Sequence, residues 1–161
     1  MVIIQNKLLI MKKLLYILTA AACLLAACEK VETMAEKMVG DWHCQSTSTD
    51  AEIYVTFTAE RTFTLYQQIG EGAFRVYNGT YELAGDSAEG AAYTLTGRYN
   101  DGSSWGASYE LNCEDRNAFT LTAEGITETY SRVEGGIPED VLSSCVTVVK
   151  SEDTKDWNPI L

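Results

Sequence analysis

The stretch Met38-Val39-Gly40-Asp41-Trp42-His43-Cys44 is the point at which this 161-residue chain changes character. Upstream of it the chain is first strongly apolar and then polar, without a strand pattern. From Gly40 onward, apolar and polar residues alternate, and β-branched and aromatic residues are frequent. Turn residues interrupt the alternation about every eight to twelve positions, which is typical of short strands joined by tight turns.

The alternation predicts eight strands. We expect them at Gly40–Thr47, Ile53–Thr58, Thr62–Ile69, Gly79–Ala84, Ala92–Tyr99, Trp105–Cys113, Ala118–Thr122 and Ile126–Val133. The residues Phe74–Tyr77 leave two alternatives open. They either extend the Gly79–Ala84 strand across Asn78-Gly79 or form a separate strand with a tight turn there.

Eight strands with short loops and no helical period between them favour an all-β fold, an eight-stranded antiparallel up-and-down β-barrel. Closure removes the exposed edges that a sandwich would keep. We place the barrel at residues 39–134. Gly135-Gly136 then breaks the chain, and residues 135–161 are expected to form a C-terminal extension that packs on the barrel. Within it, Pro138 begins a short helix and Cys145–Val149 has strand character.

Residues 1–27 have the features of a secretory signal peptide. Lys12 and Lys13 precede a short apolar run, so Met11 is the expected start, and the run is too short to span a membrane. The run ends in Leu25-Ala26-Ala27-Cys28, which resembles the lipobox of bacterial lipoproteins. That resemblance implies cleavage before Cys28 and attachment of lipid to its thiol, whereas Cys23 follows too short an apolar run.

Residues 28–38 would then be a lipid-anchored tether, either a flexible coil or a short helix. The same resemblance implies a protein of the cell envelope, in the outer membrane, on its periplasmic or its surface face. The membrane is therefore an expected partner through the anchor.

The charge of the chain excludes one class of partner. Of the 12 Lys and Arg residues, Lys7, Lys12 and Lys13 leave with the signal peptide, so the formal net charge changes from −11 to −14. This sign repels nucleic acid and anionic lipid headgroups, and we expect no nucleic-acid partner.

The cysteines and the single histidine exclude several site chemistries. After processing, Cys44, Cys113 and Cys145 remain, and an oxidising compartment predicts one disulfide and one free thiol, with the pairing open. Their spacing forms no metal motif, and His43 has no second histidine with which to build a metal site or a catalytic triad. We therefore expect no metal, no cofactor and no enzyme activity.

Alternation also assigns the inward face of each strand, and that face is rich in aromatic rings, which predicts a small interior cavity. In an up-and-down order the first strand rises from one end and the last descends to it. Trp42 and Arg132 are therefore expected at the same level, where they can stack as a cation–π pair.

Short motifs along the barrel resemble the small lipocalin-like domains found in many bacterial lipoproteins. They are Gly40-Asp41-Trp42, Phe57, Gly79-Thr80-Tyr81 and Tyr130-Ser131-Arg132-Val133. Lipocalins place such a tryptophan at the closed end and lay an arginine of the last strand across it. The resemblance spans Val39–Val133 and implies that Gly40, Trp42 and Arg132 close the barrel. The sequence departs from the family at Arg61, where a glycine is usual.

The inward residues at the other, open end combine aromatic walls with polar tips, as small-molecule sites do. The candidate ligand-binding residues are Gln67, Tyr99, Trp105, Tyr109 and Glu128. If Glu128 points inward, desolvation should raise its pKa unless a cation or a donor group of a ligand meets it. A register shift at Gly125 would instead leave Glu128 on the surface.

Two functions follow from this reading. The first is the binding of a small, partly apolar molecule at the open end. The second is a filled barrel that docks an envelope protein or serves as a structural part of an envelope complex.

Overall fold

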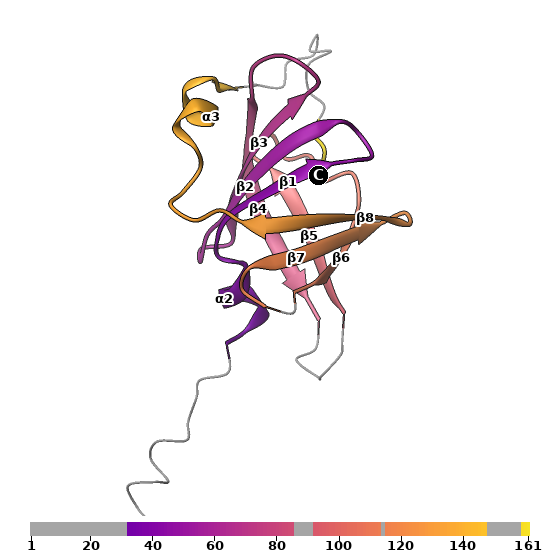
Figure 1. Cartoon of the computed structure of the whole chain (residues 1–161). Coiled ribbons are helices and arrows are strands. Elements are labelled where there is room, and N and C mark those ends of the chain that lie inside the picture. Colours follow the sequence, from indigo (N-terminus) through magenta and orange to yellow (C-terminus); the bar gives the residue numbers. More distant parts are fainter. Residues whose placement is uncertain (1–31, 86–91, 114, 148–158) are drawn as a thin grey trace, which may run out of the picture. The chain divides into compact units, whose positions relative to one another are not determined.

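The computed structural model describes residues 32–85, 92–113, 115–147 and 159–161. The predicted signal peptide, Met11 and the lipid-attachment residue Cys28 lie outside the described residues. Residues Thr33–Leu161 form one unit (Figure 1). Its elements are α2 (Met34–Met38), β1 (Gly40–Ser46), β2 (Ala51–Phe57), β3 (Thr62–Ile69), β4 (Arg75–Ala84), β5 (Tyr93–Tyr99), β6 (Tyr109–Asn112), β7 (Ala118–Ala123), β8 (Ile126–Arg132), α3 (Glu139–Ser143) and β9 (Val146–Thr147).

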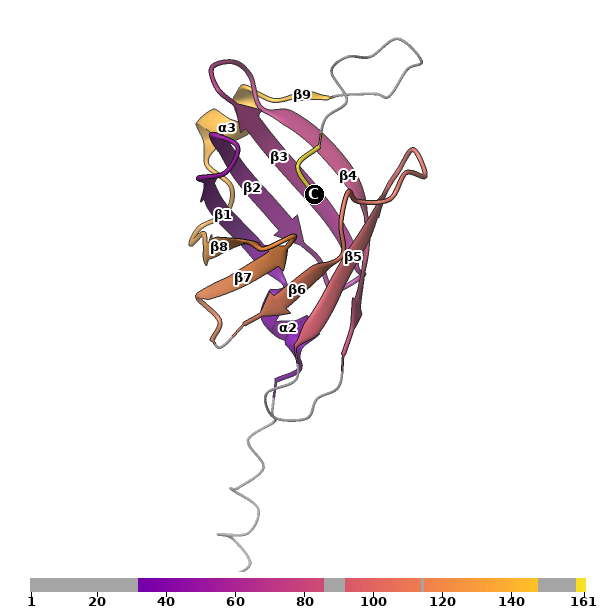
Figure 2. The same ribbon diagram turned by 90° about the vertical axis from the view of Figure 1, so that its right-hand side faces the viewer.

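Strands β1 to β8 form a closed antiparallel barrel (Figure 2). Each of these strands pairs antiparallel with the next strand along the chain. The last strand, β8, pairs antiparallel with the first, β1, so the sheet closes on itself. The predicted eight-stranded up-and-down barrel is therefore confirmed.

The period-two alternation of the sequence decides which side chains enter the core. Along β2 every second residue, from Ala51 to Phe57, is buried, and the residues between them are partly exposed. Strand β4 runs without a break through Asn78-Gly79, so Phe74–Tyr77 leads into this strand rather than forming a separate one. At Arg61, where the sequence departs from the family, the backbone adopts a φ of 63°, the left-handed conformation in which glycine is common.

Trp42 and Arg132 stack on each other at one end of the barrel. They are direct partners in the β1–β8 register, and Arg132 Cζ lies 4.2 Å from the centre of the indole ring. The guanidinium also donates hydrogen bonds to the carbonyl oxygens of Val39 and Lys37, at 3.0 and 2.8 Å. The guanidinium can lie against position 40 because this residue is a glycine. A Cβ on Gly40 would overlap Arg132 Nη1.

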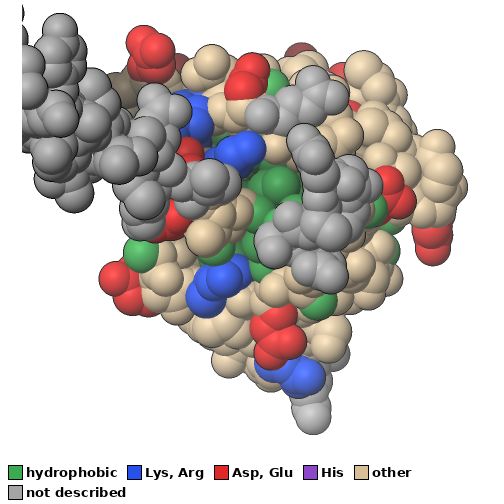
Figure 3. All heavy atoms as spheres, turned by 90° about the horizontal axis from the view of Figure 1, so that it is seen from below, with side chains coloured by type: hydrophobic (Ala, Val, Ile, Leu, Met, Phe, Trp, Pro, Cys, Tyr) green, Lys and Arg blue, Asp and Glu red, His purple; other side chains and the backbone are tan. Residues whose placement is uncertain are grey.

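Helix α2 completes this closed end. A capping box starts it, in which Thr33 and Glu36 bond to each other's backbone N–H groups. Met38 at its end is fully buried, and the indole N–H of Trp42 donates to the Met38 carbonyl at 2.8 Å. The folded unit thus takes in the end of the segment assigned to the tether. Seen from this side, hydrophobic side chains lie between Lys and Arg side chains (Figure 3).

Aromatic rings fill the barrel above this floor. Phe119 meets Trp42 edge-on, with ring centres 4.6 Å apart, and stacks on Tyr130 at 4.8 Å. Phe63 meets the indole of Trp105 edge-on at 5.1 Å. Such rings pack at offset or perpendicular angles, and these contacts pack the interior of the barrel next to Trp42.

The sixth strand is shorter than predicted. We expected Trp105–Cys113, but Trp105 to Ser108 lie outside β6, which begins at Tyr109. The cause is the indole of Trp105, which covers Gly97 so closely that a Cβ on this glycine would overlap the ring. The Trp105 N–H still donates to the Gly97 carbonyl of β5 at 2.9 Å, and the preceding Ser104 forms an isolated bridge with Arg98. The pairing between β5 and β6 therefore begins only at Tyr109, and the residues from Trp105 to Ser108 do not take part in it.

The extension after the barrel packs on its outer wall. Val141 of α3 is buried, and β9 adds to β4 as a short parallel strand through Arg75 and Val76. The expectation of one disulfide is wrong for this structure, because Cys44, Cys113 and Cys145 are all free thiols. Cys44 and Cys113 are buried, whereas Cys145 lies partly exposed between α3 and β9.

Candidate functional site

The open end of the barrel holds a cavity of about 330 Å³, which we call the mouth cavity. Polar groups of Ser46, Ser48 and Glu128 line one part of it. The remaining wall is largely apolar or aromatic and includes Ala107, Tyr109, Leu121, Ala123, Ile126 and Tyr130. Apolar walls with a few converging polar groups are the usual composition of small-molecule sites.

Glu128 lines the mouth cavity, which corresponds to the inward one of the two alternatives left open by the sequence. Its Oε1 accepts hydrogen bonds from the hydroxyls of Ser46 and Ser48, both at 2.8 Å. Desolvation raises the pKa of Glu128, but these bonds and the backbone N–H groups of Thr47 and Ser48 outweigh it, so the net pKa is lowered. The pKa is not raised because the protein itself supplies the donors, from Ser46 at the end of β1 and from Thr47 and Ser48 in the loop after it, a case that the expectation did not include.

Cys44 is the nearest thiol to this carboxylate. Its Sγ donates a weak hydrogen bond to Glu128 Oε2 at 3.8 Å. Burial, and next the charge of Glu128, raise the pKa of Cys44 to about 12. The group is therefore a neutral thiol at physiological pH, and it lacks the thiolate character that a nucleophile or a metal ligand needs.

A short segment of the chain itself, Pro159-Ile160-Leu161, lies in the mouth beside the mouth cavity (Figure 2). Three of the predicted ligand-binding residues hold it. The Ile160 N–H donates to Gln67 Oε1 at 2.7 Å, and the Tyr99 hydroxyl donates to the Leu161 carbonyl at 2.7 Å. The Tyr109 hydroxyl donates to the Ile160 carbonyl at 3.3 Å.

The tyrosines of the mouth are neutral hydrogen-bond donors. Burial raises the pKa of Tyr99 and Tyr109, and it raises the pKa of the fully enclosed Tyr130 strongly. Removing a phenolic proton here would place an uncompensated charge in an apolar surrounding. The hydroxyls of Tyr99 and Tyr109 therefore remain donors to the segment across the whole physiological pH range.

The structure brings four of the five predicted residues to one site and separates the fifth. Tyr109 and Glu128 line the mouth cavity, while Gln67 and Tyr99 hold the segment that forms part of its wall. Trp105 is buried in the wall, and its Nε1 has no hydrogen-bond partner among the described residues. It lines a second cavity instead.

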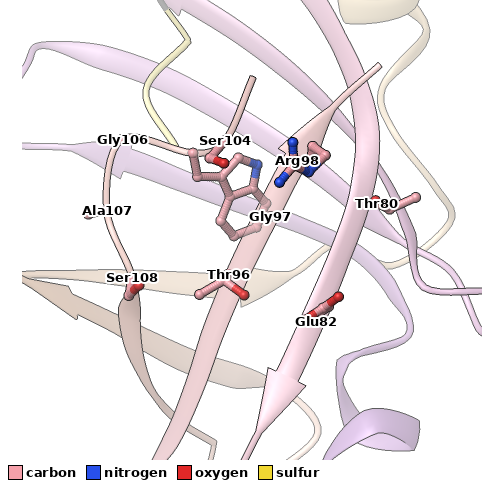
Figure 4. A pocket seen from close by; sticks show the side chains of 10 residues that line it. Thr80, Glu82, Thr96, Gly97, Arg98, Ser104, Gly106, Ala107 and Ser108 are labelled. Carbon is pink, nitrogen blue, oxygen red and sulfur yellow. The ribbon is translucent and has the colours of Figure 1, made fainter. Parts of the chain in front are cut away.

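This second cavity, of about 390 Å³, is a polar groove on the barrel wall (Figure 4). Its side chains come from three neighbouring segments: Thr80 and Glu82 of β4, Thr96 and Arg98 of β5, and Ser104 and Ser108 of the segment before β6. The groove exists because Trp105 to Ser108 leave the sheet.

Four residues of the mouth were not predicted as site residues. Ser46 lies near the end of the first predicted strand and Ser48 just after it, while Ile160 and Leu161 lie in the predicted C-terminal extension. The usable signal for the first pair was a serine cluster at the end of a strand that leads to the open side. For the second pair it was an apolar dipeptide after Pro159, in a region otherwise rich in polar residues.

No cluster of His, Cys, Asp or Glu that could hold a metal ion occurs in the described part of the chain. Among the same residues, no helix combines the length and the apolar character needed to cross a membrane. Comparison with protein-family models, with curated proteins and with solved structures found no match.

Proposed function

We propose that this chain is a lipocalin-like lipoprotein of the cell envelope, anchored through Cys28, that binds a small, partly apolar molecule in the mouth cavity. The observation that carries the binding function is the cavity itself. It measures about 330 Å³ and is walled by aromatic and aliphatic side chains, with the Glu128 carboxylate at one side. Protein pockets that bind small molecules have volumes from about this size upward.

The charge of the lining narrows the ligand class. Glu124 and Glu128 line the mouth cavity, and no Lys or Arg is among the described residues that do so. The lowered pKa of Glu128 keeps this carboxylate ionised at neutral pH. An anionic ligand would therefore be repelled, whereas a neutral or cationic molecule with a hydrogen-bond donor suits the site.

The anchor would present the mouth away from the membrane. Helix α2 starts at Met34 and lies at the closed end of the barrel. Thr33 lies five positions after Cys28, so even a fully extended chain between them reaches at most about 18 Å. The closed end would thus face the bilayer, and the open mouth would face the aqueous compartment from which a ligand arrives.

The test is to isolate the acylated protein from its native envelope and to analyse it by native mass spectrometry. We expect a small molecule bound one to one. Ala107 lines the cavity, so Ala107→Phe should remove the bound mass. The exposed Ala84 at the end of β4 provides the matched control, and Ala84→Phe should retain it.

The same preparation decides between the two functions. Recovery of the wild-type barrel without any small molecule, together with a stoichiometric envelope protein, would reject ligand binding and favour the docking function.

A further inference from the structure

The Pro159-Ile160-Leu161 segment is held in the mouth in the way a protein holds a peptide ligand. Its backbone N–H and carbonyl groups bond to side chains of three different strands: Gln67 of β3, Tyr99 of β5 and Tyr109 of β6. Gln67 is 1 % exposed and Tyr99 is 3 % exposed, so two of the three recognition groups are buried. Buried polar groups arranged around a backbone define a site for an amide.

The side chains of the segment fill the apolar part of the same site. Leu161 is 3 % exposed and belongs to the core cluster, and Ile160 packs against that cluster. Both residues also line the mouth cavity. A molecule that enters the mouth cavity must therefore contact Ile160 and Leu161, and a larger one must displace them.

The polar groups of the site are fixed with or without this segment. Gln67, Tyr99 and Tyr109 are strand residues whose register is set by the pairings β2–β3, β4–β5 and β5–β6. Because the barrel strands position them, a molecule that takes the place of the segment meets the same amide oxygen and the same two hydroxyls. A replacement ligand of the same chemistry can therefore form the same hydrogen bonds.

We propose that residues 159–161 are a tethered ligand of the mouth. The mouth recognises an amide backbone that carries two aliphatic side chains, and this segment occupies the site until an external ligand replaces it. The competition with an external ligand rests on the proposed binding function, whereas recognition of the segment does not.

The test uses a chain that stops at Asn158 and the peptide acetyl-Asn-Pro-Ile-Leu-amide, measured by isothermal titration calorimetry. We expect saturable one-to-one binding to the shortened chain, and binding at least tenfold weaker to the full chain, whose site is occupied. Tyr99→Phe in the shortened chain should weaken binding roughly two- to tenfold, because one hydrogen bond is lost. The matched control peptide, with Asp in place of the final Leu, should not bind.

A second variant covers the case in which the shortened chain does not fold. Leu161→Asp in the full chain places a charge where the core cluster excludes water, so the segment should leave the mouth. This folded variant should then bind the peptide as the shortened chain does. The proposal is overturned if neither protein, once shown to be folded by circular dichroism, binds the peptide.

The outcomes also separate this inference from the function on which the competition rests. Peptide binding without any small molecule in the native preparation would keep the tethered ligand and reject the ligand-binding function. Recovery of the same amount of small molecule with the full and the shortened chain, without peptide binding, would do the reverse.

Discussion

Gly40 shows how far the closed end depends on the chemistry of one position. Its φ of 134° lies in the region that favours glycine, and Arg132 Nη1 occupies the space of a Cβ. We predict that Gly40→Ala lowers the free energy of unfolding by about 1–3 kcal/mol through backbone strain alone, with a further loss from the displaced guanidinium.

Urea denaturation of matched glycine variants checks this value. Gly102 also has a positive φ, of 88°, but no heavy atom lies within 4 Å of its would-be Cβ. Gly102→Ala therefore reports backbone strain without a clash. Equal losses in the two variants would show that the contact with Arg132 contributes nothing.

Glu128 makes stability depend on pH. Its folded-state pKa is lowered, so the ionised carboxylate stabilises the fold at pH values above its unfolded pKa of about 4.3. This contribution disappears as the pH falls through the folded pKa. We predict that Glu128→Gln destabilises the protein at neutral pH by at most about 1 kcal/mol, since the carboxylate is partly exposed.

The difference in unfolding free energy between wild type and Glu128→Gln should stay constant from pH 7 down to about pH 5 and shrink below that. Denaturation series at several pH values measure it. A difference that instead grows as the pH falls would mean that the folded state raises the pKa of Glu128, contrary to the serine contacts.

At the scale of elements, the sequence predicted the strands well where alternation alone determines them. Strands β1 to β5 and β7 to β8 lie within a few residues of the predicted ranges, because each buries one face. The prediction was wrong at Trp105–Ser108, where the alternation of the sequence continues although the chain leaves the sheet. The reason is a contact between distant residues, the indole on Gly97, which no local pattern contains.

The candidate site was predictable to the same degree. The alternation of side chains along each strand predicted that Gln67, Tyr99, Tyr109 and Glu128 face inward at the mouth. Which residues of a strand face inward can be read from its local sequence. The donor Ser46 alternates in step with Trp42 and Cys44, so the pattern could have placed it at the mouth. Ser48 and the segment 159–161 lie outside the strands, and their positions depend on how loops and chain ends fold back, which the pattern does not encode.

The contact between β5 and the Trp105 segment gives a prediction of its own. Gly97→Ala would push a methyl group into the indole of Trp105, so we expect a loss of about 1–3 kcal/mol from overpacking and a shift of the tryptophan emission. Gly106→Ala is the control, because no heavy atom lies within 4 Å of its would-be Cβ. Unchanged emission in Gly97→Ala would place the indole elsewhere.

At the scale of the whole molecule, the two ends of the barrel differ. Aromatic rings pack around Trp42 and Phe119 at the closed end, whereas the mouth cavity lies at the open end, near the loops after β1 and β7. With an anchor at the closed end, stability and binding would be assigned to different ends of one barrel. Variants of the mouth should thus change binding more than folding.

The anchor itself gives the prediction at this scale. Cys28→Ser should abolish labelling by radioactive fatty acid and move the protein from the membrane fraction to the soluble fraction. Each buried methylene contributes about 0.8 kcal/mol, so loss of the acyl chains removes most of the membrane affinity. Cys23→Ser should leave label and fractionation unchanged. Label that persists in Cys28→Ser and disappears in Cys23→Ser would move the processing site.

The most direct measurement of the central claim is a crystal structure of the mature protein purified from its native envelope. We predict electron density for a small molecule in the mouth cavity, within hydrogen-bond distance of Glu128 or Tyr109, with the guanidinium of Arg132 over Trp42 at the other end. A mouth filled by the protein's own side chains, with no room for a ligand beside Glu128, would contradict the account.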